Sequence, residues 1–206
     1  MTAEIKESLT KGETTRILIE DSAIELFMEQ GYHATTMRQI AERAEMASVG
    51  GIYNHFASKE EIFEAIILDK HPYKRVFPAI VEAEGDTVEE FLHNAAQIVM
   101  KELKSQPYYI KLMLIEIVEF NGKHGSTLIR KIAPKALPIF EKIVKTRKNL
   151  RITHPALLLR SFIGMVMSYM LTDIIISNSI LQKLMPKNAM DTYVDIYLHG
   201  ILKPEV

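Results

Sequence analysis

Residues 31–63 read GYHATTMRQIAERAEMASVGGIYNHFASKEEIF, and this stretch determines how the rest of the chain is interpreted. Thr36 and Gln39 have the spacing of a capping box, in which two side chains satisfy the free amides at the start of a helix. Ser58 and Glu61 repeat that spacing. The sequence therefore predicts one helix that begins at Thr36, another that begins at Ser58, and a compact helical segment between them.

The segment between those helices contains Gly50 and Gly51 in succession. A glycine inside a helix costs about 1 kcal/mol relative to alanine, so this pair suggests that the backbone must approach another molecule closely. Ile52 and Phe56 are four residues apart and would anchor an inner face. The remaining outward positions are small or polar: Ser48, Gly51, Asn54 and His55. Such a helix suits insertion into the major groove of DNA, and the alternative is a small helical bundle without a ligand.

Several runs agree in order and spacing with a known family, and they are Gly31-Tyr32, Thr35-Thr36, Ile40-Ala41, Ser48 to Phe56 and Ser58 to Glu61. On these residues the first third of the chain resembles the TetR family of transcriptional regulators. The turn from Ala44 to Ser48 is one residue longer than the usual family pattern, and Glu45 stands where glycine is common. The resemblance implies a TetR-like all-α homodimer, most often a repressor, that binds a palindromic DNA operator and is released by a small molecule.

The resemblance also indicates which residues would contact DNA. Tyr53 and His55 match positions that commonly donate hydrogen bonds to phosphates, although they could instead brace the motif. Lys59 lies at a predicted helix N-terminus, which favours an anion, and it is either a phosphate contact or a solvated lysine. The predicted interface also includes the residues expected to face bases, Ser48, Gly51 and Asn54, together with Thr36, Arg38 and Gly50.

Charge does not by itself predict binding to nucleic acid. The 206 residues have a net charge of −1, and residues 1–60 hold six Lys or Arg against ten Asp or Glu. Because phosphate neutralisation supplies much of the affinity of proteins for DNA, this balance argues against non-specific coating of DNA. It remains compatible with a site-specific reader in which Arg38, Arg43 and Lys59 face the phosphates while the acidic residues face away.

Other classes of protein are disfavoured by composition. The chain has no cysteine, which excludes disulfides and zinc-thiolate sites and suits a reducing cytoplasm. Its N-terminus lacks the apolar core of a signal peptide, and Arg160 and Asp173 interrupt the most hydrophobic stretch, 156–177, so we predict a cytoplasmic protein without a membrane span. The seven histidines show no metal-ligand spacing, and no phosphate loop or catalytic constellation occurs. We therefore predict no metal, no cofactor and no enzymatic activity.

The residues after Pro72 have helical periodicity, so we predict a helix-turn-helix domain with a connecting helix at 1–72 and an effector-binding and dimerisation domain at 73–206. The helix from Thr153 to Ser177 is apolar nearly all round and needs cover on both sides, and a second copy of the chain is one such cover. With a last helix, Asn188 to Leu202, it would form a four-helix dimer interface. The interface residues we predict are Ser161, Gly164, Ser168, Thr172, Tyr193 and Tyr197.

The sequence contains 11 methionines, which either fill gaps in a core or line an adaptable apolar pocket. The predicted walls of such a pocket are Phe91, Met113, Ile117, Met165 and Tyr169. Nothing in these residues selects a particular charge, so the small-molecule effector would be largely apolar. The alternative function is a helical ligand-binding or partner-binding protein that has lost specific DNA binding.

Overall fold

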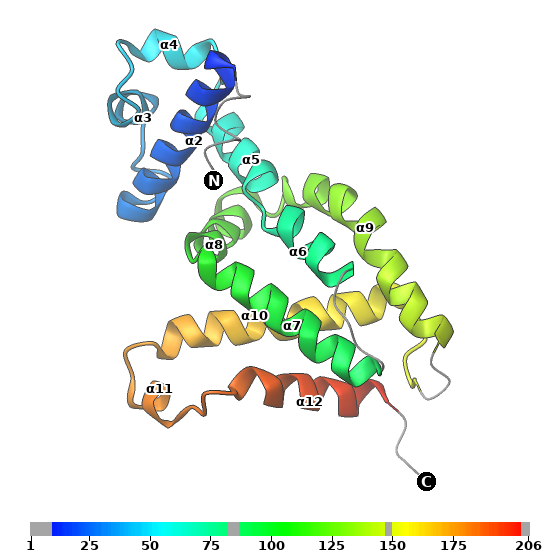
Figure 1. Ribbon diagram of the computed structural model, residues 1–206. Helices are drawn as coiled ribbons and strands as arrows, with labels where there is room; N and C mark the ends of the chain where they lie inside the picture. Colours follow the sequence, from blue (N-terminus) through cyan, green and yellow to red (C-terminus); the bar gives the residue numbers. More distant parts are fainter. Residues whose placement is uncertain (1–9, 82–86, 147–149, 203–206) are drawn as a thin grey trace. The chain divides into compact units, whose positions relative to one another are not determined.

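The computed structural model describes residues 10–81, 87–146 and 150–202, and these fold into helices joined by turns, which confirms the all-α prediction (Figure 1). The helices form two compact units. The first comprises the described residues up to His71 together with Lys111–Leu128, and the second comprises Pro72–Ile110 and the described residues from Ile129 onward. The packing thus differs from the predicted functional domains in one segment, because 111–128 packs with the N-terminal residues. The functional division at residue 72 stays a prediction.

The first unit contains α2 (Lys11–Gln30), α3 (Met37–Arg43), α4 (Val49–Tyr53), α5 (Lys59–Asp69) and most of α8 (Tyr108–Phe120). α2 contacts both α3 and α5, and α3 contacts α4. The side chains at the centre of this unit are large, apolar and almost fully buried: Ile19, Phe27, Ile40, Ile52, Phe56, Ile62, Phe63 and Ile66. Because α4 contributes its apolar side to this core, its opposite side is presented outward.

Local capping explains where the first helices begin. The Thr36 hydroxyl accepts from the Gln39 amide at 3.2 Å and the Gln39 side chain accepts from the Thr36 amide at 2.9 Å, so the predicted capping box is present. α2 begins three residues before the expected position at Thr14. The reason is a capping box of the same kind, in which Thr10 accepts from the Glu13 amide and Glu13 accepts from the Thr10 amide.

The helix α5 has only half of the capping box that its sequence predicts. The Ser58 hydroxyl accepts from the Glu61 amide at 3.1 Å. The Glu61 carboxylate instead accepts from the amide of Ala57 at 2.6 Å, one residue before the expected partner. Two free amides at the start of α5 are nevertheless satisfied, which fixes the point where the chain turns from α4 into α5.

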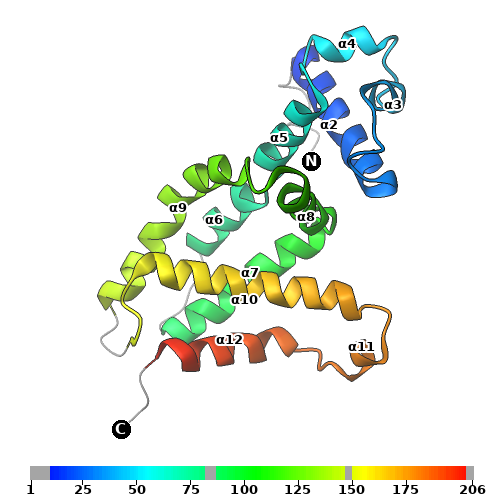
Figure 2. The same ribbon diagram turned by 180° about the vertical axis from the view of Figure 1, so that it is seen from behind.

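The second unit contains α6 (Tyr73–Val81), α7 (Val88–Ser105), most of α9 (Gly125–Thr146), α10 (Pro155–Ile176), α11 (Ile180–Leu184) and α12 (Ala189–Ile201). α7 packs against α6 and α12, and α10 packs against α12 (Figure 2). α9 continues through Pro134 and Pro138, where the sequence predicts a kink or a break. The short helix α11 was not predicted from the sequence.

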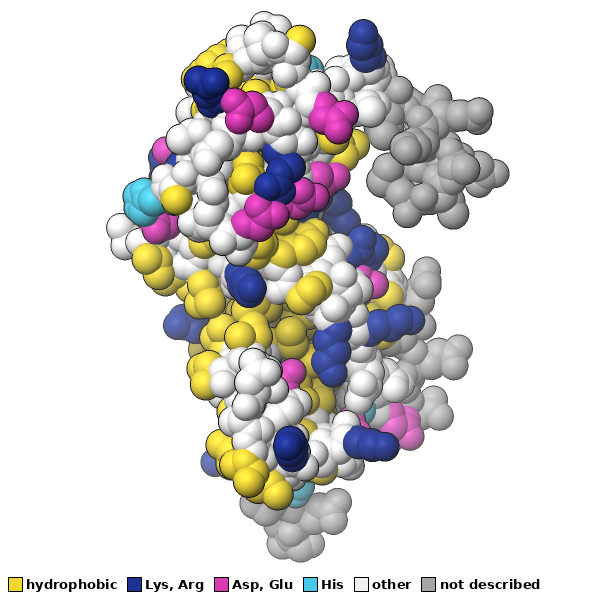
Figure 3. Space-filling model, turned by 90° about the vertical axis from the view of Figure 1, so that its left-hand side faces the viewer, with side chains coloured by type: hydrophobic (Ala, Val, Ile, Leu, Met, Phe, Trp, Pro, Cys, Tyr) yellow, Lys and Arg dark blue, Asp and Glu magenta, His cyan; other side chains and the backbone are white. Residues whose placement is uncertain are grey.

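The helix α10 has one buried and one exposed side. Its inner side buries Leu158, Phe162, Val166 and Met170, while its outer side exposes Leu157, Ile163, Ile174 and Ile175. Hydrophobic side chains also reach the surface on the face shown in Figure 3. Within the described residues, α10 is the one helix long and apolar enough to cross a membrane by length and composition, which is weak evidence for a span. The absence of a membrane span stays a prediction.

Candidate nucleic-acid interface

The turn between α3 and α4 is closed by backbone hydrogen bonds. The Met46 amide donates to the Ala41 carbonyl at 2.9 Å, and the Glu45 amide donates to the Glu42 carbonyl at 3.2 Å. Glu45 has a φ of 52° and therefore takes the left-handed conformation that usually belongs to glycine at the end of a helix. This pattern is a Schellman motif, and it fixes the direction in which the chain leaves α3 for α4.

The helix α4 exposes the residues that were predicted to face DNA. Ile52 and Phe56 are 0% and 1% exposed, so they root the segment in the core. Ser48 and Asn54 are exposed on its outer side, and Tyr53 is 55% exposed. Hydroxyl and amide groups that project from a short, rooted helix are suited to hydrogen bonds with base edges and phosphates.

The two glycines of α4 have different surroundings. A Cβ on Gly50 would lie 3.6 Å from the Ser48 hydroxyl oxygen, which is an ordinary contact. A Cβ on Gly51 would lie 2.8 Å from the methyl carbon of Met46, the end of a flexible side chain. Neither Gly50 nor Gly51 has a positive φ. The fold therefore tolerates a side chain at Gly50, and it tolerates one at Gly51 once the end of Met46 moves.

The basic side chains near α4 are bound to other groups of the protein. Arg43 donates to Glu25 at 2.9 Å and to Glu29 at 2.7 Å, and Arg38 pairs with Glu42 at 2.9 Å. At the top of Figure 3, Lys and Arg side chains accordingly lie beside Asp and Glu side chains. The expectation that the acidic residues face away from these arginines is therefore not met in the structure.

Lys59 and Arg16 are also held by the protein. The Lys59 ammonium donates to the carbonyls of Tyr32 at 2.6 Å and Thr35 at 2.7 Å and lies 4.1 Å from the centre of the Tyr32 ring. Burial lowers the pKa of Lys59. Arg16 donates to the carbonyl of His55 at 3.0 Å and lies over the ring of Phe56. A phosphate contact from Lys59 would require its bonds to the 32–35 turn to break.

The structure also holds His55 and Thr36 in place. His55 is half-buried, and its amide donates to the Ile52 carbonyl at 2.8 Å. The Thr36 hydroxyl is shared with Gln39 in the capping box. Sequence reasoning identified the exposed face of α4 but missed the partners of Arg16, Arg43 and Lys59, because those partners lie 14 to 39 positions away in the chain.

A comparison with known proteins assigns the family. The family described as bacterial regulatory proteins, tetR family, matches residues 19–66, which hold α3, α4 and most of α2 and α5. Residues 19–66 are therefore a TetR-family segment. The helix-turn-helix transcriptional regulator YvkB of Bacillus subtilis is 32% identical over 102 residues, which are 50% of this chain and 52% of YvkB.

The regulator UidR of Escherichia coli K12 is 41% identical over 59 residues, which are 29% of this chain and 30% of UidR. The similarity thus spans about half of one curated relative and about a third of the other. Among solved structures, GusR of Salmonella enterica has a TM-score of 0.72 at 22% identity, and the match covers 93% of this chain and 97% of GusR. This likeness shows that the fold extends beyond the helix-turn-helix to most of the chain.

The residues predicted for a dimer interface lie on α10 and α12. Ser161, Gly164, Ser168 and Thr172 are exposed along α10, and a Cβ on Gly164 would meet nothing within 4 Å. Tyr193 and Tyr197 differ from these four residues, because both tyrosines pack within one copy of the chain.

Tyr197 is 8% exposed and donates to the Leu158 carbonyl at 2.8 Å, so its side chain is bound inside the second unit. Tyr193 is half-buried and packs edge-on against the ring of Tyr169, with centroids 5.2 Å apart. The small residues along α10 (Ser161, Gly164, Ser168 and Thr172), which we call the small seam, therefore remain accessible to a second copy. Tyr197, in contrast, is a core residue of its own protomer.

The residues predicted for the effector pocket fall in both compact units. Phe91, Met165 and Tyr169 are half-buried in the second unit. Met113 and Ile117 lie on α8 in the first unit, where Ile117 is 59% exposed. The pocket that these residues would line stays a prediction. In the part of the chain that the structure describes, no group of three or more His, Cys, Asp or Glu is placed to hold a metal ion.

Proposed function

We propose that this protein is a DNA-binding transcriptional regulator that acts as a homodimer on a palindromic operator in the cytoplasm. The observation that carries the proposal is the outer face of α4, where Ser48, Tyr53 and Asn54 are exposed while Ile52 and Phe56 fix the helix in the core. The family match over residues 19–66 and the similarity to the regulators YvkB and UidR support the same function.

The exposed side of α10 supports the homodimer. It carries large apolar side chains, including Leu157 at 54% and Ile175 at 79% exposure, and α12 adds Ile196 at 67%. Apolar surface of this extent favours burial against another protein surface, and the small residues around Gly164 would let a symmetry-related helix approach closely. A dimer would place two α4 helices on half-sites roughly 34–36 Å apart, in successive major grooves.

We further propose that the protein is a repressor that a small, largely apolar molecule releases from its operator. The half-buried side chains Phe91, Met165 and Tyr169 are the groups in the second unit that would contact such a molecule. Release requires the effector to bind the released state more tightly than the DNA-bound state. A tenfold loss of DNA affinity corresponds to a difference of about 1.4 kcal/mol.

A second candidate function follows from the pairing of Arg38, Arg43 and Lys59 with protein acceptors. A helix-turn-helix whose basic side chains are bound to protein acceptors also suits a ligand-binding or partner-binding protein that has lost specific DNA binding. The two functions differ in one measurable property, which is selective affinity for a DNA sequence.

The test is fluorescence anisotropy of the purified protein with labelled DNA from upstream of its own gene, followed by selection from random-sequence duplexes. Selective binding at nanomolar to micromolar protein concentration would support the regulator and provide an operator for effector screening. Failure of the selection to enrich any sequence would overturn the proposed regulator and favour the second candidate.

A further inference from the structure

The corner between α8 and α9 is part of the same compact unit as the helix-turn-helix. Its ring side chains belong to a continuous aromatic cluster in that unit: Phe120 stacks on Phe63 of α5 with centroids 4.8 Å apart, and the same ring meets Tyr32 edge-on at 5.0 Å. His124 lies against Phe120, with ring centroids 4.8 Å apart. The end of α8 is therefore anchored to α5 and to the turn that precedes α3.

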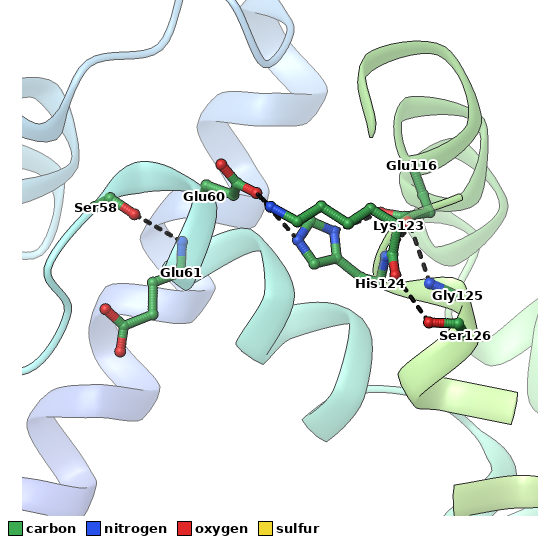
Figure 4. Close-up of polar contacts among 8 residues, drawn as sticks. All are labelled: Ser58, Glu60, Glu61, Glu116, Lys123, His124, Gly125 and Ser126. Carbon is green, nitrogen blue, oxygen red and sulfur yellow. Dashed lines mark hydrogen bonds and ion pairs between the residues drawn. The ribbon is translucent and has the colours of Figure 1, made fainter. Parts of the chain in front are cut away.

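Glu116 fixes the shape of this corner from inside it (Figure 4). Its side chain is 1% exposed, and one carboxylate oxygen accepts from the backbone amides of His124 at 2.7 Å and Gly125 at 3.0 Å. The other oxygen lies 2.8 Å from Nδ1 of His124. Glu116 therefore holds two backbone amides with one oxygen and faces the imidazole with the other.

His124 connects that carboxylate to α5. The His124 side chain is 3% exposed, and its Nε2 lies 3.4 Å from a carboxylate oxygen of Glu60, in the first turn of α5. Lys123 donates to the same oxygen of Glu60 (Figure 4). The residues Glu116, His124 and Glu60 thus form a chain from α8 through the corner to α5, and we refer to these three as the corner latch.

The number of hydrogen bonds that His124 can donate within the latch depends on how many of its two ring nitrogens carry a proton. Carboxylates only accept hydrogen bonds, and a neutral imidazole carries one N–H group. His124 can therefore donate to Glu116 or to Glu60 when it is neutral, but it can donate to both when it is protonated. Protonation of His124 therefore completes the latch, because both ring nitrogens then donate to a carboxylate.

We propose that the corner latch is a proton-sensitive device that sets the DNA affinity of this protein. Proton uptake by His124 fastens the α8–α9 corner to the first turn of α5, which follows α4 after only five residues. A recognition helix that is held in one position loses less conformational freedom when it binds. The latched form therefore binds the operator more tightly, and affinity rises as the pH falls from 8 to 6. This proposal rests on the proposed function in DNA binding.

The charged groups that meet the His124 ring come from two helices and the corner between them. Glu116 of α8 lies 2.8 Å from Nδ1, and Glu60 of α5 lies 3.4 Å from Nε2. Lys123 of the corner donates to the same oxygen of Glu60. The pKa of Glu60 is lowered by Lys123 and, to a smaller extent, by His124.

Two variants test the latch, and a third is their control. His124→Gln removes the titrating ring. Glu60→Gln removes the negative charge on α5 while its amide oxygen can still accept, at a position that is 42% exposed, so it preserves the buried packing. His33→Gln is the matched control, because His33 also pairs with a carboxylate of α8, that of Glu119, but its side chain is 82% exposed.

Each protein is measured between pH 6 and 8 by thermal unfolding and by anisotropy with the selected operator duplex. A hydrogen bond to a charged group corresponds to about a tenfold change in an equilibrium constant. The wild type and His33→Gln should therefore bind DNA about tenfold more tightly at pH 6 than at pH 8. His124→Gln and Glu60→Gln should lose most of this gain, together with the matching rise in the unfolding temperature.

The proposal is overturned if both latch variants keep the wild-type pH dependence of unfolding and of DNA binding. It is also overturned if they lose the dependence of unfolding but keep that of DNA binding, because the latch would then be structural only. If the wild type selects no DNA at any pH, the proposed function fails. The unfolding data then decide separately whether His124 couples α8 to α5.

Discussion

Arg43 forms a bidentate ion pair with Glu29, in which Nη2 lies 2.7 Å from one carboxylate oxygen and Nη1 lies 3.0 Å from the other. Glu25 accepts a further bond from the same guanidinium at 2.9 Å. These carboxylates raise the pKa of Arg43 and hold α3 against α2. The guanidinium therefore serves packing within the helix-turn-helix, and its positive charge is compensated before any DNA arrives.

The pairing of the basic residues predicts a shallow salt dependence of DNA binding. Each neutralised phosphate contributes about −0.9 to the slope of log K against log salt concentration. Arg38, whose pair with Glu42 is exposed, and Lys11 at the start of α2 are the described cations most available to phosphates. For two protomers we expect a slope of about −4 or shallower, measured by anisotropy across a potassium chloride series.

Arg43→Gln is the control for this prediction. It should leave the slope unchanged and lower stability only slightly, because its partners are largely exposed. A wild-type slope of about −8 or steeper would contradict the prediction, since it would require the protein's internal ion pairs to open on DNA.

The glycines of α4 separate stability from function. Gly50→Ala should raise the free energy of unfolding by about 0.5–1 kcal/mol, because alanine is the better helix former and the new methyl group makes an ordinary contact. Gly51→Ala should be close to neutral, since Met46 must shift its end. If the pair exists to let the backbone approach DNA, both variants should weaken operator binding about tenfold. Variants that are more stable and bind normally would refute that role.

Tyr53 offers a direct test of phosphate contact. The side chain is 55% exposed, so its removal costs the fold little. Tyr53→Ala should weaken binding to all DNA sequences while dimerisation remains intact, and Tyr53→Phe should cause much of the same loss because it removes only the hydroxyl group. Anisotropy on operator and unrelated duplexes measures both effects. Normal binding by Tyr53→Ala would exclude Tyr53 from the interface.

His71 should make the protein sensitive to acid. Burial lowers its pKa from 6.5 to about 4, so the unfolded chain takes up this proton before the folded chain does. Stability from His71 is therefore present above pH 6.5 and is lost as the pH falls toward 4, by up to about 1.4 kcal/mol per unit. Urea unfolding measures the free energy of unfolding of the wild type and of His71→Gln. As the pH falls over this range, the wild type should lose more of this free energy than the variant. A constant difference would contradict the assignment.

Local signals in the sequence predict much of the fold. The start of α3 follows from Thr36 and Gln39, and the bounds of α8 follow from Pro107 and the glycines after Phe120. The start of α2 was missed although Thr10 and Glu13 have the same capping spacing. The two prolines of α9 remove individual hydrogen bonds, yet the helix continues and buries Ala136 and Phe140 on either side of Pro138.

The candidate site was predictable only where local periodicity decides it. Ile52 and Phe56 define the inner side of α4, so the outer side follows from the sequence. The partner of Lys59 is a carbonyl 27 residues earlier, and no local pattern predicts that bond. The same holds for Glu60 and His124, because tertiary packing alone brings them together.

Gly164→Leu tests the proposed dimer at its closest point. A Cβ at this position meets nothing within 4 Å in one protomer, so leucine should leave the monomer folded and slightly favour the helix. In a dimer that packs α10 through its small seam, the leucine would hold the partner helix away and weaken association. Sedimentation velocity should show a shift from dimer to monomer and a parallel loss of DNA affinity, because each half-site would be bound separately. Lys104→Leu, on an exposed position of α7, controls for an added apolar side chain. An unchanged dimer for Gly164→Leu would place the interface elsewhere.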